Sequence, residues 1–344
     1  MRSKQQRSVL LIYTGGTIGM MQDVKSGQLR PFDFSHLEEQ IPELKKFDVK
    51  LHSIAFEKPL DSSDMQPATW IRLAKLIEKN YNDFDGFVIL HGSDTMSYTA
   101  SALSFMLENL GKPVILTGSQ LPIGIIRTDG KENLITAIEI ASAIERGKPL
   151  VNEVCIYFEF KLYRGNRTHK FNAEQFNAFR SPNYPELAEA GVHLRFERNA
   201  IMKFPKGKFK VHTELDPRIS ILKIFPGITK EAVDAIINTK GLKALIIETF
   251  GAGNASTATW FLDSVKAGIK KGLIIYNVTQ CNAGAVEQGK YQTSAGLAKI
   301  GVVGGADITT EAAVCKLMFL LGKKHPASDL KKMLARSLRG ELSV

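Results

Sequence analysis

Runs of consecutive apolar residues alternate with segments of helical periodicity through the first half of the chain. The apolar runs predict strands at the ranges 8–14, 87–90, 113–116 and 154–158. Between these runs, apolar residues that recur every three or four positions predict a helix at 99–110, ended by Gly111, and another at 133–144. Strands that are apolar throughout and separated by amphipathic helices are typical of a parallel sheet covered by helices on both faces.

The alternation stops between residues 171 and 217, where prolines are frequent and charges of both signs mix, and then resumes in shorter units. Strands are predicted in this second half at 219–225, 244–249, 273–278 and 302–303. Helices are predicted there at 230–238, 257–267 and 310–321. We therefore predict an α/β fold in two domains: a larger N-terminal domain at 1–197 with a parallel or mixed sheet, a linker at 198–217, and a smaller C-terminal α/β domain at 218–344.

The composition is typical of a globular protein and excludes a disordered or fibrous chain, since 44% of the 344 residues are hydrophobic and 23% are charged. No apolar run approaches the roughly 18 residues that span a bilayer. The short apolar run that follows the basic N-terminus ends in Thr-Gly-Gly, which favours a first strand over a signal peptide. Membrane association is therefore not expected.

The cysteines and histidines indicate neither a disulfide nor a metal. Cys155, Cys281 and Cys315 are odd in number, distant in the sequence and each in an apolar context. We therefore expect reduced thiols in the core and a cytoplasmic location. No cluster of cysteine and histidine has the spacing of metal ligands, and we expect no metal and no other cofactor.

Basic residues exceed acidic ones, 45 against 35, which gives a net charge of +10 and raises the question of nucleic-acid binding. The basic residues are scattered, however, and the densest group, at 203–208, is short. No aromatic-interleaved RNA-binding motif occurs. A solvated basic surface that attracts anionic or zwitterionic solutes is favoured over a nucleic-acid partner.

Polar residues gather in four segments that follow predicted strands or apolar runs. These segments are Thr14–Gly19, Asp61–Asp64, His91–Thr95 and Thr117–Gln120. Because ligands of open parallel sheets bind at the carboxyl ends of the strands, we expect the four segments to meet in one crevice. Hydroxyls and carboxylates that converge in this way indicate a catalytic or binding site.

Thr17 is the candidate nucleophile in the first segment. On its own, the Gly-Gly turn before it is also explained by tight backbone geometry or by phosphate binding, although the dinucleotide and P-loop motifs are both absent. A hydroxyl nucleophile needs a base. Ser93 bridged to Lys170, with Asp94 holding the lysine, would supply one without histidine, although Lys170 considered alone is more readily explained as a surface lysine. We expect His91 to be a buried structural residue.

Two long motifs and several short ones match a known family. The long motifs are YTGGTIGM at 13–20 and GFVILHGSDTM at 86–96. The short motifs are LDSSDM at 60–65, SFMLENL at 104–110, LYRGNR at 162–167, FGAGN at 250–254 and LRGEL at 338–342. On these motifs the chain resembles, over essentially its whole length, the bacterial type I (cytoplasmic) L-asparaginases of the asparaginase/glutaminase family.

The resemblance implies hydrolysis of the side-chain amide of L-asparagine in two displacements. Thr17 would form an acyl-enzyme and release ammonia, and water would then free aspartate. Ser93, Asp94 and Lys170 match the relay of the family, and backbone N–H groups near Gly92 and Ser93 are the expected oxyanion donors.

Substrate binding is assigned by the same resemblance to polar residues of the four loops and to one residue of the second domain. They are Asp61, Ser62, Ser63, Ser93, Asp94, Ser119 and Asn254. In this family the sites lie between subunits, so the resemblance implies a homodimer or homotetramer in which Asn254 completes the neighbour's site.

Four positions depart from the family pattern. Ser93 stands where threonine is usual, so the hydroxyl is kept but its rotamer is less restrained. Gln28 stands near a tyrosine position on the segment 20–30, which we expect to be a lid. His169 and Glu248 replace a threonine and an arginine that bind a second asparagine in some members, and we expect no strong allostery of that kind.

Three other functions are compatible with the sequence. Glutamine is longer than asparagine by one methylene, worth about 1–3 kcal/mol in a pocket, so weaker glutaminase activity is one of them. An asparaginase-like subunit of a tRNA-dependent amidotransferase would share the motifs, but is expected to carry an additional N-terminal domain. A non-catalytic amino-acid-binding module is the third, although it would not need the relay residues.

Overall fold

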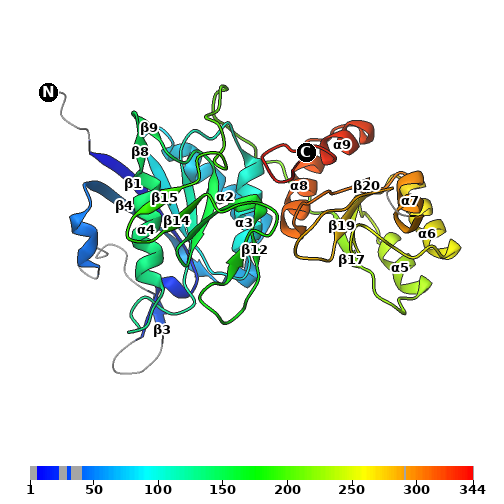
Figure 1. Cartoon of the computed structure of the whole chain (residues 1–344), viewed down its shortest axis with the longest axis horizontal. Helices are drawn as coiled ribbons and strands as arrows, with labels where there is room; N and C mark the ends of the chain where they lie inside the picture. Colours follow the sequence, from blue (N-terminus) through cyan, green and yellow to red (C-terminus); the bar gives the residue numbers. More distant parts are fainter. Residues whose placement is uncertain (1–5, 23–28, 32–40, 290–291, 344) are drawn as a thin grey trace. The chain divides into compact units, whose positions relative to one another are not determined.

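Two compact units make up the chain, Met1–Thr213 and Glu214–Val344. The computed structural model describes residues 6–22, 29–31, 41–289 and 292–343 (Figure 1). Each unit is built around one main sheet with helices, mixed in the first unit and parallel in the second, and this confirms the predicted fold class. The division falls inside the segment 198–217 that is predicted as a linker.

An eight-stranded sheet forms the centre of the first unit, in the order β15-β14-β11-β10-β7-β5-β1-β4. Its strands are β1 (Arg7–Gly15), β4 (Val49–Leu60), β5 (Gly86–Leu90), β7 (Val114–Thr117), β10 (Val154–Phe158), β11 (Lys161–Arg164), β14 (Ala188–Ala190) and β15 (Leu194–Phe196). β4, β1, β5, β7 and β10 run parallel, and the other three strands add antiparallel at one edge. β5 and β10 are buried along their whole length, as predicted for strands that are apolar throughout.

Helices cover both faces of this sheet. α4 (Gly130–Ser142) packs on the face that carries Leu11, and the alternation of side chains along β1 turns Ile12 to the opposite face. α3 (Met96–Met106) contacts β7 and β10, and α2 (Pro67–Asn80) packs against α3. Short 3-10 helices occur as η1 (Thr17–Gly19), η3 (Pro42–Lys46), η4 (Ser62–Asp64) and η5 (Gly165–Arg167).

Two-stranded pairs complete the first unit. They are β2 (Met20–Gln22) with β3 (Leu29–Pro31), β6 (Leu107–Glu108) with β16 (Lys210–Val211), β8 (Ile144–Glu145) with β9 (Lys148–Pro149), and β12 (His169–Lys170) with β13 (Phe179–Arg180). All four pairs are antiparallel.

The β6–β16 pair corrects the predicted end of one helix. α3 ends at Met106 rather than at 110, because β6 turns away to pair with β16 and the Met106 carbonyl accepts a hydrogen bond from the His212 N–H. The left-handed residue after the helix is Asn109, with φ 55°, rather than the predicted Gly111. Periodicity along one segment carries no information about a partner that lies about one hundred residues away in the chain.

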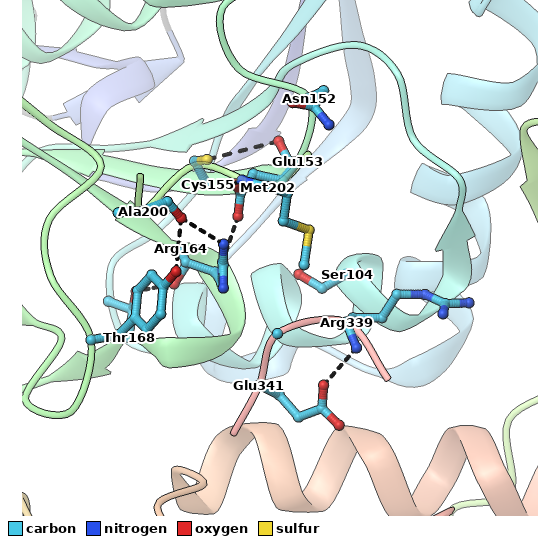
Figure 2. A network of polar contacts seen from close by, with 12 residues as sticks. Ser104, Asn152, Glu153, Cys155, Arg164, Thr168, Ala200, Met202, Arg339 and Glu341 are labelled. Atoms are coloured by element: carbon cyan, nitrogen blue, oxygen red, sulfur yellow. Dashed lines mark hydrogen bonds and ion pairs between the residues drawn. The ribbon is translucent and has the colours of Figure 1, made fainter. Parts of the chain in front are cut away.

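A buried ion pair attaches residues 200–202 to the first unit (Figure 2). Arg164 Nε donates to Glu153 Oε2 at 2.6 Å, and the two side chains are 7% and 4% exposed. Arg164 Nη2 donates to the Ala200 carbonyl at 2.8 Å, and the Met202 N–H donates to Glu153 Oε1 at 2.7 Å. This part of the predicted linker segment is therefore packed on the first unit.

The second unit is a four-stranded parallel sheet in the order β17-β18-β19-β20. Its strands are β17 (Ile219–Lys223), β18 (Ala244–Thr249), β19 (Ile274–Thr279) and β20 (Val303–Gly304). Its helices are α5 (Lys230–Ile237), α6 (Thr259–Lys270), α7 (Gln292–Lys299), α8 (Thr310–Gly322) and α9 (Ala327–Leu334). The strands and helices predicted in this half are thus confirmed to within a few residues, and α7 and α9 are additional.

A second buried ion pair fastens the C-terminal segment to this unit. Lys316 Nζ lies 2.7 Å from Glu341 Oε1, and both side chains have 0% exposure. Lys316 also donates to the Arg336 carbonyl, and Glu341 accepts a 2.7 Å hydrogen bond from the Arg339 N–H (Figure 2). Loss of one partner would leave an unpaired buried charge and destabilise the fold by about 3–5 kcal/mol. The pair therefore gives the LRGEL motif a structural role.

The cysteine prediction is correct at two positions and wrong at the third. Cys155 and Cys315 are buried, but Cys281 is exposed, because it follows β19 in a polar loop. None of the helices in the described part of the chain combines the length and apolar character that crossing a lipid bilayer requires.

Candidate functional site

The site lies where the connections of the first sheet change direction. β4 pairs with one side of β1 and β5 with the other, so the chain leaves β1 toward one edge and continues from β5 toward the opposite edge. In open α/β sheets this switch point forms a crevice outside the carboxyl ends of the strands. Thr17 follows β1 and Ser93 follows β5, so both predicted catalytic hydroxyls stand at this edge.

Close backbone packing brings the polar loops together. A Cβ on Gly16, whose φ is +88°, would lie 2.4 Å from the Gly92 nitrogen, and one on Gly92 would lie 2.6 Å from Ser62 Oγ. A Cβ on Gly118 would lie 2.4 Å from the His91 carbonyl oxygen. Since no real Cβ approaches so closely, these glycines let the four loops touch, as the sequence predicts.

Lys170 connects two of the predicted relay residues. Its Nζ donates to Ser93 Oγ at 2.9 Å and to Asp94 Oδ1 at 2.5 Å. The lysine side chain is 17% exposed and the Asp94 side chain is 60% exposed. Ser93 and Asp94 lie just before Thr95, the N-cap of α3, and the N-terminus of this helix favours a carboxylate. The structure thus places Lys170 with Ser93 and Asp94 rather than on an open surface.

The position of Lys170 depends on how closely η5 approaches α3. A Cβ on Gly165 would lie 2.9 Å from Ala100 Cβ and 3.0 Å from the Val154 carbonyl, so only glycine fits there. After this turn, Thr168 Oγ1 donates to the Arg164 carbonyl at 2.7 Å. β12 then pairs with β13 and presents Lys170 at the start of α3.

His91 is buried and structural, as predicted. Its Nδ1 donates to the Gly92 carbonyl at 2.6 Å, and its Nε2 accepts from Thr99 Oγ1 at 2.9 Å. Thr99 in turn accepts from Trp70 Nε1 at 3.0 Å. Burial lowers the pKa of His91 to about 4, so the ring is neutral near pH 7. These contacts fix its tautomer and tie the loop before Ser93 to α2 and α3.

The segment Asp61–Asp64 forms a tight turn beside this loop. Asp61 accepts a 2.8 Å hydrogen bond from the Ser63 N–H, and this bond lowers the pKa of the carboxyl below its ordinary value. The Ser62 carbonyl accepts from Thr95 Oγ1 at 2.7 Å, and Ser62 itself is buried against Gly92. Ser63 is exposed. The turn therefore presents Asp61 and Ser63 to solvent and fixes Ser62.

The fourth loop contains a functional candidate that the sequence analysis did not single out. Ser119 is buried and its hydroxyl donates to the Leu121 carbonyl at 2.5 Å, so toward a ligand it can act only as an acceptor. The adjacent Gln120 reaches Ser93, whose Oγ donates to Gln120 Oε1 at 3.4 Å. No motif marks a glutamine as a relay contact, and only its place in the folded loop reveals it.

The remaining predicted residues belong to the second unit, to the strand that carries Lys170, or to the part of the chain outside the described residues. Asn254 belongs to the second unit, where its Oδ1 accepts from Thr293 Oγ1 at 2.7 Å. Glu248 also belongs to the second unit and accepts from Thr310 Oγ1 at 2.7 Å. His169 precedes Lys170 in β12. Gln28 lies outside the described residues; on either side of it, β2 and β3 pair antiparallel.

Within the described residues, no three side chains of histidine, cysteine, aspartate or glutamate are grouped so as to hold a metal ion. The groups that the cluster offers are hydroxyls, an amine, a carboxylate and backbone amides. These are the groups that covalent catalysis by a hydroxyl nucleophile requires.

Comparison with known proteins gives matches over both units. Residues 8–202 match the N-terminal asparaginase family, and residues 218–334 match the glutaminase/asparaginase C-terminal domain. The chain is 43% identical over 343 residues to L-asparaginase 1 of Escherichia coli K12, covering 98% of this chain and 99% of that protein. The crystal structure of L-asparaginase I from Vibrio cholerae is similar with a TM-score of 0.90 and 40% identity, covering 98% of this chain and all of that one.

A further relative bears on the alternative functions. The chain is 31% identical over 346 residues to a subunit of the glutamyl-tRNA(Gln) amidotransferase of Pyrococcus abyssi, covering 97% of this chain and 76% of that protein. The fold and the site define a two-unit α/β amidohydrolase. The chain belongs to the asparaginase family, which confirms the resemblance found in its motifs.

Proposed function

We propose that this protein is a cytoplasmic asparaginase, which hydrolyses L-asparagine to L-aspartate and ammonia through an acyl-enzyme on Thr17. The observation that carries the proposal is the contact of Lys170 with Ser93 and Asp94 beside the Thr17 loop. A base relay at the switch point of the sheet, next to a hydroxyl nucleophile, supports acyl transfer.

In the first displacement, the Thr17 hydroxyl oxygen attacks the side-chain amide carbon of asparagine. The C–N bond breaks, ammonia leaves with the proton that the threonine gives up, and the aspartyl group stays on Thr17 as an ester. Lys170 accepts the proton through Ser93 and returns it to the leaving nitrogen. Asp94 Oδ1 accepts a 2.5 Å hydrogen bond from Lys170 Nζ, and this bond keeps the amine next to Ser93.

In the second displacement, a water molecule replaces the amide nitrogen and attacks the ester. The same Ser93–Lys170 pair removes the proton of the water, and Thr17 recovers its proton as aspartate leaves. Backbone N–H groups near Gly92 and Ser93 stabilise the oxyanion in both steps. The His91 contacts to Gly92 and Thr99 support this role because they fix the peptide at 92.

The substrate's polar and charged groups are assigned to polar residues of the neighbouring loops. Asp94 is 60% exposed and keeps free acceptor directions beside Lys170, so it also binds the α-ammonium group. Asp61, Ser62, Ser63 and Ser119 line the loops on either side. Asn254 of a neighbouring subunit completes the site in a homodimer or homotetramer.

Two alternatives remain within the family. Glutamine hydrolysis at a lower rate follows if the pocket tolerates one more methylene, which costs about 1–3 kcal/mol. Supply of ammonia to a partner amidotransferase follows from the similarity to the Pyrococcus amidotransferase. Ammonia release by the isolated protein without tRNA favours the asparaginase.

Ammonia release from L-asparagine by purified wild type and by Thr17→Ala tests the proposal. We expect turnover by the wild type and a loss of at least about 10³-fold in Thr17→Ala. A wild type that binds asparagine without releasing ammonia would support the binding-module alternative. A Thr17→Ala variant with full activity would show that the nucleophile is a different residue.

A further inference from the structure

Gln120 lies between the relay serine and the segment that follows the relay lysine. Its side-chain Nε2 donates to the carbonyl oxygens of Ala173 and Gln175, at 3.2 Å and 3.0 Å. Its Oε1 lies 3.4 Å from Ser93 Oγ. One side chain therefore contacts both the loop after β5 and the residues that follow Lys170 in the chain.

The two carbonyl contacts determine which way round the Gln120 amide stands. A carbonyl oxygen only accepts hydrogen bonds, so the NH₂ group of the amide must face Ala173 and Gln175. The Gln120 oxygen is then left to face Ser93, where it can only accept. This assignment rests on the hydrogen-bond network around the amide.

The orientation of Gln120 in turn determines the direction of the Ser93 hydroxyl. Lys170 donates to Ser93 Oγ at 2.9 Å, so the serine must accept there. While the lysine donates, the single serine proton points to Gln120 Oε1, and it turns to the lysine, about the same Oγ position, when the lysine accepts in the relay. At 3.4 Å the bond to Gln120 is long and weak, so it biases the serine rotamer rather than locking it.

Hydrogen bonds fix the backbone of Gln120, so its side chain is held beside Ser93. The Gln120 N–H donates to both carboxylate oxygens of Asp129, at 3.1 Å and 2.9 Å. Asp129 is 8% exposed and also accepts from the Leu121 N–H and from Asn133 Nδ2. The buried Asp129 carboxylate therefore fixes the backbone of the loop from which the Gln120 side chain extends.

We propose that Gln120 is a positioning residue of the relay and restrains the Ser93 side chain so that its Oγ stays within hydrogen-bond distance of Lys170 Nζ. Serine has a single γ atom and three staggered rotamers, whereas a β-branched residue such as threonine is restricted at χ1. Gln120 supplies by a hydrogen bond the restraint that a γ-methyl would supply by its bulk. The inference rests on the proposed function, since it concerns the same relay.

The test measures kcat and KM for L-asparagine hydrolysis in wild type, Gln120→Ala, Ser93→Thr and the double variant. Loss of one weak hydrogen bond is expected to lower kcat of Gln120→Ala about three- to tenfold with KM nearly unchanged. The kcat of Ser93→Thr is measured as the reference for the double variant. In the double variant, the γ-methyl should restore kcat to within about twofold of the Ser93→Thr value, because the restraint is supplied again.

Recovery of kcat in the double variant distinguishes a positioning role of Gln120 from a merely structural one. If Gln120 only held the 173–175 segment through its NH₂ group, a methyl on residue 93 would restore nothing, and an unrescued double variant would overturn the inference. Gln120→Met, which keeps the volume of the side chain, gives the same comparison if Gln120→Ala does not fold. Equal kcat in wild type and Gln120→Ala would also overturn it, while leaving the proposed function intact. An inactive wild type would instead overturn the proposed function and the inference together.

Discussion

His91 is a histidine whose pKa lies far from its ordinary value. Burial lowers its pKa from 6.5 to about 4, although its Nδ1 bond to the Gly92 carbonyl acts in the opposite direction. The neutral ring both donates to Gly92 and accepts from Thr99. Protonation would place a second N–H against the Thr99 hydroxyl and add an unpaired charge in the core, so the folded protein resists it.

This neutral histidine predicts a specific loss of stability in acid. In the unfolded chain His91 binds a proton near pH 6.5, whereas in the folded protein it does so only near pH 4. Its contribution to stability is therefore complete above pH 6.5 and declines as the pH falls toward 4. The decline amounts to on the order of 3 kcal/mol over that interval.

Denaturant unfolding between about pH 4 and pH 7 measures this contribution. The His91→Asn variant keeps a donor near the Nδ1 position but cannot titrate, so its unfolding free energy should fall less steeply over the same range. Identical pH slopes for the variant and the wild type would mean that His91 does not titrate as its burial requires.

The candidate site residues that the sequence could name are those marked by a local motif. Ser93, Asp94 and Lys170 could be named because a hydroxyl nucleophile needs a base and because the motifs around them match a family. Gln120 could not be named, since its role depends on a contact with residues that are far away in the chain. Cys281 was misplaced because its apolar neighbours on β19 end just before an exposed loop.

At the scale of elements, the site depends on how closely loops can approach one another. Gly16 carries a φ of +88° and also has no room for a side chain, since a Cβ would lie 2.4 Å from the Gly92 nitrogen. Gly147, in the turn between β8 and β9, has a similar φ of +78° but open space around it. Substitution at Gly147 would therefore cause backbone strain alone, whereas substitution at Gly16 would cause both backbone strain and a clash between loops.

Gly16→Ala and Gly147→Ala form a matched pair of variants. Both should lose about 1–2 kcal/mol of stability from the left-handed backbone, as thermal or denaturant unfolding reports. Only Gly16→Ala should lose asparaginase activity, by at least about 100-fold, because it separates the Thr17 and Ser93 loops. Full activity in Gly16→Ala would contradict the contact between these loops.

Most strands and helices were predictable because their apolar pattern is local. β5, β7, β10 and β18 are short, apolar and buried on both faces, so the sequence alone indicates them. α2 has no counterpart among the predicted helices, although the spacing of Trp70, Leu73, Ala74 and Ile77 is the signal that would have indicated it. The end of α3 at Met106 could not be predicted from its own periodicity, because it depends on the pairing of β6 with β16.

At the scale of the whole molecule, the two-unit α/β organisation was predictable because the apolar alternation is interrupted once, near the division at 213–214. The assembly of subunits could not be predicted in this way. No pattern in one chain reports which surface contacts a second copy, and the role of Asn254 follows from the family resemblance. Mixed oligomers of two variants test whether the second unit of one subunit completes the site of another.

Subunit complementation tests the shared site. Thr17→Ala and Asn254→Ala are each expected to be nearly inactive. A mixed dimer would contain one fully wild-type site, formed by Thr17 of one variant and Asn254 of the other. Refolding or coexpressing equal amounts should therefore restore about a quarter of wild-type activity. No restoration in verified mixed oligomers would mean that both residues serve a site within one subunit.

The central claim is that Thr17 carries the acyl group, and a rapidly quenched reaction with L-asparagine tests it most directly. Intact-mass spectrometry of the wild type should reveal a species heavier by asparagine minus ammonia, and peptide mapping should place the addition on the segment that contains Thr17. Thr17→Ala should show no such species, while Lys170→Met should slow its formation and decay. An adduct that persists in Thr17→Ala, or one that maps to another residue, would contradict the account.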